Sequence, residues 1–231
     1  MDAPQGKALD LFDAYRTNLT KVDATRAPAG AILCPLDFAL IQRADVESKT
    51  VPLEHIIPQH ATVASKQTEF TNLAAKDVRS GATLTCSRCN GKKGKELDFP
   101  LRGLIAPGPH KPEEYTYRTG TAILTYAYLF AFAVFGYEYI FKEELAEVRA
   151  QFEDPDGRHT EWLEHAHVCT ANMEQPIVAN EWGYPFAAGI ARGAPLELYF
   201  WRFRAKLPGL DGVKTAIEIP ASISGAARLS G

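Results

Sequence analysis

Two stretches of the chain carry side chains that could do chemistry. In the first, VPLEHIIPQ at 51–59, Glu54 comes directly before His55 inside an apolar, strand-like run. Adjacent residues on a strand point to opposite faces of the sheet, so these two side chains cannot share one core position. An unperturbed imidazole has a pKa near ~6.5, which suits proton transfer at neutral pH. A functional site at the end of the strand could use both side chains, one from each face.

The second stretch, TLTCSRCNGKKGKELD at 83–98, combines a C-x-x-C pair with a concentration of positive charge. The segment 84–95 contains no acid, although the whole chain has a net charge of −3. Its cations are Arg88, Lys92, Lys93 and Lys95. Cations beside the free backbone N–H groups of a helix start can bind phosphate. Taken alone, such a run is more simply interpreted as a solvated surface turn.

Together the two stretches resemble the HNH, or ββα-metal, endonuclease family. The residues that carry the resemblance are Glu54, His55, Ile56, Ile57 and Pro58, then Cys86, Cys89, Asn90 and Lys93. The resemblance covers about residues 31–98. It implies an α+β fold with a small ββα-metal module, and an enzyme that hydrolyses phosphodiester bonds. The expected partner is nucleic acid, with double-stranded DNA as the preferred substrate.

The resemblance also implies a role for each matching residue. His55 would be the general base, and Glu54 and Asn90 would hold Mg²⁺ or another divalent cation. Such a hard cation accepts oxygen ligands and keeps other positions for water and phosphate. Asn72 would orient His55 as a further catalytic residue, provided that the segment 74–83 loops out. The expected phosphate-binding residues are Arg88, Lys92, Lys93 and Lys95.

Many members of the family carry a structural zinc held by two C-x-x-C pairs. The first pair here reads CPLD, with Cys34 followed by Asp37, and the second pair is Cys86 and Cys89. Because zinc accepts carboxylate oxygen, these four residues could form a complete zinc site. The sequence leaves open whether the zinc has been lost and whether another residue completes the site.

Composition places these motifs in an ordinary globular chain of 231 residues, 46% of them hydrophobic. Its net negative charge excludes a global basic field, so nucleic acid would have to bind a local patch. Residues 1–16 lack the apolar segment of a signal peptide. We therefore expect a reducing, cytoplasmic compartment, where a C-x-x-C pair more often means metal or redox chemistry than a disulfide.

The elements that must position the motifs divide the chain into four parts. We expect an N-terminal helical segment at 1–30 with a helix over 7–22, the HNH module at 31–98, and a proline-rich linker at 99–114. A mixed helical and β region of unknown role follows at 115–231. Its expected elements are a buried helix over 119–136, a second helix over 138–152, a turn at 153–158, and a β-hairpin pairing 196–206 with 213–220.

Three alternatives depend on other features of the sequence. A non-catalytic, zinc-supported nucleic-acid-binding module would keep the same scaffold. The uncharged segment 119–137 is just long enough to span a bilayer, although its threonines, tyrosines and alanines favour a buried helix and no membrane partner. A second metal site could form from His159, His165, His167 and Cys169.

The segment LELYFWRFRAK offers a further arrangement of aromatic and basic side chains. A continuous strand would place Tyr199, Trp201 and Phe203 on one face, and Arg202, Arg204 and Lys206 on the other. Such interleaving can bind nucleic acid. It is more often one buried and one solvated face of a sheet.

Overall fold

The computed structural model describes residues 3–56, 82–105, 116–168, 186–189, 196–200 and 203–209. This part of the chain combines helices with small antiparallel sheets, so the expected α+β class is confirmed. The elements up to the middle of the chain are α1 (Ala3–Asp23), β1 (Ala31–Leu33), β2 (Leu40–Gln42), α2 (Arg43–Glu47), β3 (Leu53–His55), β4 (Ala82–Leu84), α6 (Ser87–Lys92), the π-helix η1 (Lys93–Asp98) and α7 (Phe99–Ile105). Those that follow are α8 (Tyr117–Phe135), α9 (Tyr137–Ile140), α10 (Glu144–Glu153), the 3-10 helix η3 (Glu161–His165), β5 (His167–Val168), β6 (Phe186–Gly189), β7 (Leu196–Phe200) and β8 (Phe203–Leu207).

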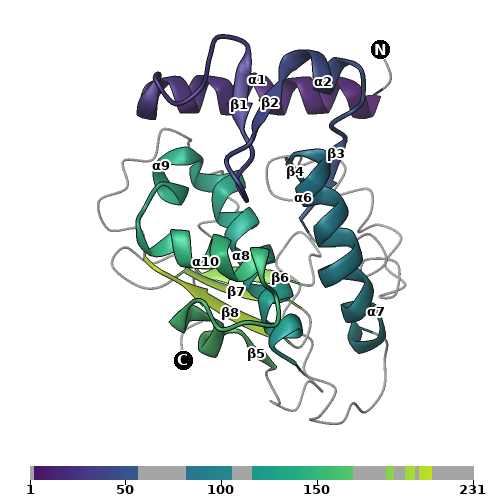
Figure 1. Cartoon of the computed structure of the whole chain (residues 1–231), viewed down its shortest axis with the longest axis vertical. Helices are drawn as coiled ribbons and strands as arrows, with labels where there is room; N and C mark the ends of the chain where they lie inside the picture. Colours follow the sequence, from purple (N-terminus) through teal and green to yellow (C-terminus); the bar gives the residue numbers. More distant parts are fainter. Residues whose placement is uncertain are drawn as a thin grey trace.

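Helix α1 confirms the predicted N-terminal helix and is longer at both ends. Its buried side chains recur every three or four residues, as an amphipathic helix requires. They include Phe12, Tyr15 and Leu19. The helix lies across the β1–β2 hairpin and α2 at one end of the molecule (Figure 1). Its apolar stripe therefore covers the hairpin that begins the predicted module.

The predicted module contains two separate antiparallel pairs of short strands. Strand β1 pairs with β2, and β3 pairs with β4, with Glu54 opposite Thr83. Only two residues separate β4 from the start of α6. The order strand, strand, helix at β3–β4–α6 is therefore the order that a ββα unit requires.

Helix α6 continues through η1 into α7 as one rod (Figure 1). The prediction of a linker at 99–114 is therefore wrong for residues 99–105, which form α7. Residues 106–115 lie outside the described part of the chain. Pro100 is the second residue of α7, which directly follows the π-helix.

Helix α8 confirms the predicted buried helix. Its described side chains from 119 to 133 are all buried, which is typical of a helix that crosses the interior of a protein. Among the described residues, no helix combines the length and hydropathy that a bilayer crossing needs. The expected helix over 138–152 is divided into α9 and α10, and the expected turn after it is present.

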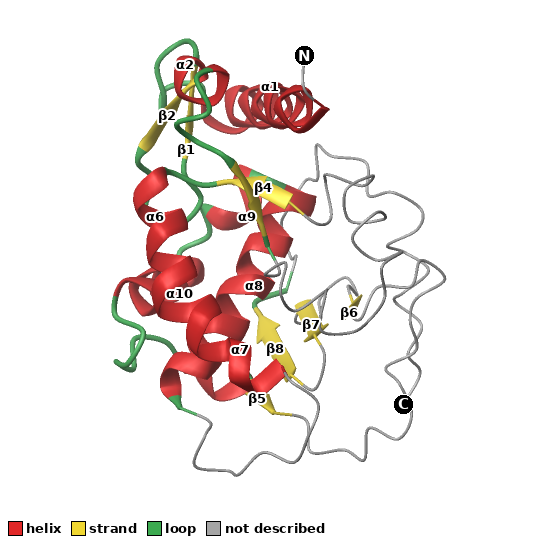
Figure 2. Ribbon diagram, turned by 90° about the vertical axis from the view of Figure 1, so that its right-hand side faces the viewer, coloured by secondary structure: helices red, strands yellow, loops and turns green. Residues whose placement is uncertain are grey.

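The β-hairpin prediction is wrong. The sheet has the order β5-β8-β7-β6, and its central hairpin pairs β7 with β8, both inside the segment 196–207. The register places Tyr199 opposite Arg204, so the continuous strand assumed for this segment does not form. Residues 210–231 lie outside the described part. Figure 2 shows the sheet beside α8, against which β7 and β8 pack.

One hydrophobic core joins the predicted module at 31–98 to the region after residue 115. The core runs continuously from α1 through the β1–β2 hairpin and α8 to β8. The Tyr137 hydroxyl donates to the Leu33 carbonyl at 2.5 Å, and the Tyr128 hydroxyl donates to the Pro35 carbonyl at 2.6 Å. The predicted boundary between 31–98 and 115–231 therefore does not correspond to a boundary between cores.

Candidate metal centre and histidine strand

Four side chains from two segments meet beside the first turn of α6. They are Cys34 after β1, Asp37 in the β1–β2 turn, and Cys86 and Cys89 at the start of α6. One ligand atom from each lies within 4.8 Å of all the others. Cys34 and Cys89 are buried, and the other two are half-buried. These are the four predicted ligands, and the tertiary structure brings them together.

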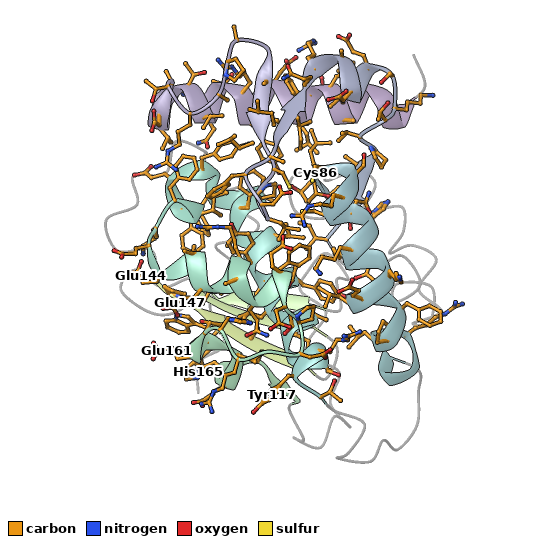
Figure 3. All side chains as sticks on the ribbon, in the orientation of Figure 1. Cys86, Tyr117, Glu144, Glu147, Glu161 and His165 are labelled. Carbon is orange, nitrogen blue, oxygen red and sulfur yellow. The ribbon has the colours of Figure 1, made fainter. Side chains whose placement is uncertain are left out.

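Local backbone geometry arranges the two halves of this cluster. The Phe38 amide donates to the Cys34 carbonyl at 2.9 Å, and Phe38 has a φ of 58°, which closes a tight turn around Asp37. Cys86 caps α6, where its Sγ accepts from the Cys89 amide at 3.4 Å. The Cys86 amide donates a hydrogen bond to the Cys34 Sγ at 3.4 Å. Figure 3 shows Cys86 at the end of α6 that faces the β1–β2 hairpin.

Three sulfur donors and one carboxylate form a donor set that suits zinc in a closed, four-coordinate structural site. Burial raises the pKa of the Cys34 thiol. Burial would also raise the pKa of Asp37, but hydrogen bonds from Cys34, the Ala39 amide and Arg88 outweigh it and hold that pKa at about 2. The carboxylate is therefore charged over the whole physiological range. The cluster could hold a metal ion such as zinc.

Arg88 lies beside this cluster and contacts one of its four ligands. Its Nη2 lies 3.0 Å from Asp37 Oδ2 and 2.6 Å from Glu153 Oε1 on α10. Three thiolates and a carboxylate around one Zn²⁺ would carry a net charge of about −2, which an adjacent guanidinium offsets. The predicted phosphate contact is not supported for Arg88, because its guanidinium already bridges two carboxylates.

Strand β3 carries the predicted catalytic pair. Glu54 is buried and His55 is half-buried. Glu54 Oε1 lies 2.7 Å from the Lys93 ammonium, which also lies 2.9 Å from Asp98 Oδ2 and donates to the His55 carbonyl at 3.1 Å. Burial alone would lower the pKa of Lys93, but the two carboxylates raise it, so the side chain stays charged.

Lys93 therefore does not occupy the position that its predicted role requires. Its side chain is 0% exposed, whereas a phosphate-binding lysine must reach solvent. The physical reason is that residue 93 lies on the side of the rod that faces β3 and α8, where the buried Glu54 and the half-buried Asp98 need a cation. The prediction that Lys93 contacts phosphate is wrong.

Two residues of this network were not selected from the sequence. Asp98 Oδ1 accepts a hydrogen bond from the Tyr126 hydroxyl on α8 at 2.8 Å, while its other oxygen faces Lys93. The Lys93 ammonium also lies 5.2 Å from the centre of the Tyr126 ring. The signal that could have pointed to Asp98 is its spacing of five residues from Lys93, but that spacing is meaningful only in a π-helix.

The other predicted residues have mixed outcomes. Asn90 is half-buried on α6, three residues before Lys93 and hence close to it on the helix surface. Lys92 pairs with Glu96 at 3.0 Å, and Lys95 is exposed. Asn72 lies outside the described residues.

The alternative second metal site gains no support from the described part of the chain. There, His159 Nε2 lies 2.7 Å from Asp154 Oδ2, and the Cys34, Asp37, Cys86 and Cys89 cluster is the only group that could hold a metal. The side chain of residue 167 and the whole of residue 169 are not described.

Comparisons of the chain with protein-family models, curated proteins and solved structures gave no match. Function must therefore be argued from the residues of the site and their contacts. Those contacts define two adjoining centres on one rod, the cysteine cluster at its start and the Glu54–Lys93–Asp98 network one turn further along.

Proposed function

We propose that the chain is a divalent-metal-dependent endonuclease of the HNH type that hydrolyses phosphodiester bonds in double-stranded DNA. One observation carries the proposal. A Cys₃Asp cluster lies at the start of the helix in a strand–strand–helix unit, and the first strand of that unit carries the Glu54–His55 pair. The cluster would bind structural zinc, since its four ligands leave no open position for substrate.

In this proposal His55 is the general base. Burial and the positive charge of Lys93 both lower the pKa of His55, which favours the neutral imidazole that can accept a proton from water. The His55 carbonyl is fixed by Lys93, so the backbone at the end of β3 is held in place. A fixed backbone limits the positions that the ring can take, which serves the orientation of an attacking water.

The residues proposed to hold Mg²⁺ or a similar ion are Glu54 and Asn90. When bound, that ion would offset the charge on the phosphoryl oxygens and the leaving group. Burial raises the pKa of Glu54, and the charge of Lys93 opposes that rise. With both carboxylates ionised, the network of two carboxylates and one ammonium would carry one negative charge that favours a nearby cation. Lys95, and Lys92 beside Glu96, are the cations on this rod that would contact phosphate.

The test is plasmid nicking by the full-length chain in Mg²⁺ and in Mn²⁺, with EDTA as the metal-free condition. We expect nicking that EDTA abolishes, and a loss of at least about a hundredfold in His55→Ala. His165→Ala is the matched control, because His165 is exposed on η3 and should retain full activity. The full chain is needed because the module shares its core with α8. A wild-type chain that cleaves neither DNA nor RNA with either ion would contradict the proposal.

A non-catalytic, zinc-supported nucleic-acid-binding module is the second candidate. The observation that favours it is the ion pair between Glu54 and Lys93, which engages a proposed metal ligand in an interior contact. In that case DNA binding, measured by fluorescence anisotropy, would be unchanged in His55→Ala, and no metal would produce cleavage.

A further inference from the structure

The buried charges beside β3 form a connected chain of contacts that ends in the C-terminal region. The Tyr126 hydroxyl donates to Asp98, Asp98 pairs with Lys93, and Lys93 contacts both Glu54 Oε1 and the His55 carbonyl. Tyr126 and Lys93 are fully buried, and the Asp98 side chain is 15% exposed. In such surroundings each hydrogen-bonded charge has few alternative partners, so its position is well defined.

The π-helix η1 makes this chain of contacts possible. Its hydrogen bonds connect residues five apart, which brings Lys93 and Asp98 to the same side of the rod. In a continuous α-helix, residues three and four apart would be neighbours instead. Single π-turns are rare and occur frequently at functional sites. Here the turn supplies a second carboxylate to the ammonium that holds Glu54.

Helix α8 provides the fixed end of the network. It is buried from residue 119 to residue 133 and packs against α10, β8 and η1, so the Tyr126 ring is held by the main core. The same ring lies 5.2 Å from the Lys93 ammonium and adds a cation–π contact to the hydrogen bond with Asp98. Movement of α8 relative to the rod would therefore be transmitted to β3.

We infer that Asp98 and Tyr126 are positioning residues for the proposed reaction, acting on Glu54 and His55 through Lys93. This inference rests on the proposed function and assigns part of the site to the region after residue 115. Neither residue touches substrate. Their effect is to fix the carboxylate of Glu54 and the backbone of His55, where a displacement of about 1 Å can lower the rate a hundredfold.

The experiment compares two tyrosine-to-phenylalanine variants of the full-length chain. Tyr126→Phe removes the hydroxyl that holds Asp98. Tyr139→Phe is the matched control, because it removes an equally buried hydroxyl that donates to the Pro208 carbonyl at 2.7 Å, away from β3. We expect Tyr126→Phe to lower kcat about tenfold with KM changed less than about twofold, and Tyr139→Phe to leave both unchanged. Asp98→Asn, which keeps the size of the side chain, should lower kcat further.

A second readout does not depend on cleavage. The ring C–H signal of His55 in an NMR spectrum reports the surroundings of the imidazole, and it should shift in Tyr126→Phe but not in Tyr139→Phe. If the wild type cleaves nothing while this shift appears, the proposed function fails and the positioning network stands. If both variants leave the His55 signal in place, or lower kcat equally, the inference is overturned.

Discussion

Lys93 belongs to a run of cations that is typical of a surface, but its own side chain is buried. Its ammonium is fully buried and lies within 3.1 Å of three oxygens, from Glu54, Asp98 and the His55 backbone. A buried charge is tolerated only where such partners replace water. The residue therefore stabilises the junction between β3 and the rod, and loss of its charge should cost more than loss of a surface charge.

Substitution of this lysine should be costly. Lys93→Met leaves the buried Glu54 and the half-buried Asp98 without a cation, and we expect the free energy of unfolding at neutral pH to fall by about 3–5 kcal/mol. Lys95→Met on the same π-turn is the control, because residue 95 is exposed and the change should stay within about 0.5 kcal/mol. Urea denaturation measures both values. Equal effects of the two substitutions would show that the buried pair contributes little.

The cysteine cluster makes a second prediction at the residue scale. Cys89→Ser replaces a buried ligand, so the purified protein should lose its equivalent of zinc and unfold at a lower temperature. Ser87→Ala is the control for metal content, since Ser87 lies on the same turn of α6, is exposed and is not one of the four ligands. Metal analysis and thermal unfolding before and after EDTA measure the effect. Stoichiometric zinc in Cys89→Ser would disprove the assignment of this residue as a ligand.

At the scale of elements, the end of α8 is set by one glycine. Gly136 has a φ of 71°, a left-handed conformation that L side chains rarely adopt, and it allows the chain to turn directly into α9. The turn is held by Asn18 of α1, whose Oδ1 accepts from the Tyr137 amide at 2.8 Å. A β-carbon at position 136 would overlap the Asn18 amide. The contact connects the first helix to the most buried one.

Gly136→Ala should therefore destabilise the protein by about 1–3 kcal/mol, from backbone strain and displacement of Asn18. Gly91→Ala offers a matched control on α6, where an added β-carbon meets nothing within 4 Å. There alanine has the higher helix propensity, and stability should rise by up to about 1 kcal/mol. Chemical denaturation shows whether each substitution lowers or raises the free energy of unfolding. A neutral Gly136→Ala would mean that the α8–α9 turn relaxes freely.

For the whole molecule, the main feature is one core that buries the rings of several tyrosines. The hydroxyls of Tyr15, Tyr128 and Tyr137 each have an interior partner: Thr83 Oγ1 for the first, and the Pro35 and Leu33 carbonyls for the others. These hydrogen bonds connect α1 and α8–α9 to the strands and turn of the candidate site. The region after residue 115 is therefore part of the framework of the site.

This core makes the stability sensitive to alkaline pH. Burial raises the pKa of Tyr15, Tyr128 and Tyr137 above the value of about 10 that unfolded tyrosines have. Unfolded tyrosines then lose protons before folded ones, so the free energy of unfolding should fall as pH rises from about 9 to 11. Urea denaturation at several pH values measures the slope. Tyr15→Phe should make the slope shallower, and an unchanged slope would contradict this cause.

Features that depend on short-range patterns could be predicted from the amino-acid sequence. The periodicity of apolar residues predicted α1, and an uncharged segment of helix length predicted α8. The two short ligand pairs predicted the four members of the cysteine cluster. Such patterns are readable because helix geometry and metal-ligand spacing are local. They also located β3 and the start of α6, so the framework of the candidate site could be predicted.

Which charged side chains face inward could not be predicted from the sequence. A run of cations does not reveal that Arg88 bridges Asp37 and Glu153, or that Lys93 is enclosed by Glu54 and Asp98. Those partners come from elements distant in sequence, and the π-turn that aligns Lys93 with Asp98 follows no hydrophobic period. The physical reason is that burial of a charge depends on the opposite charges that packing brings to it, and packing is a property of the whole fold.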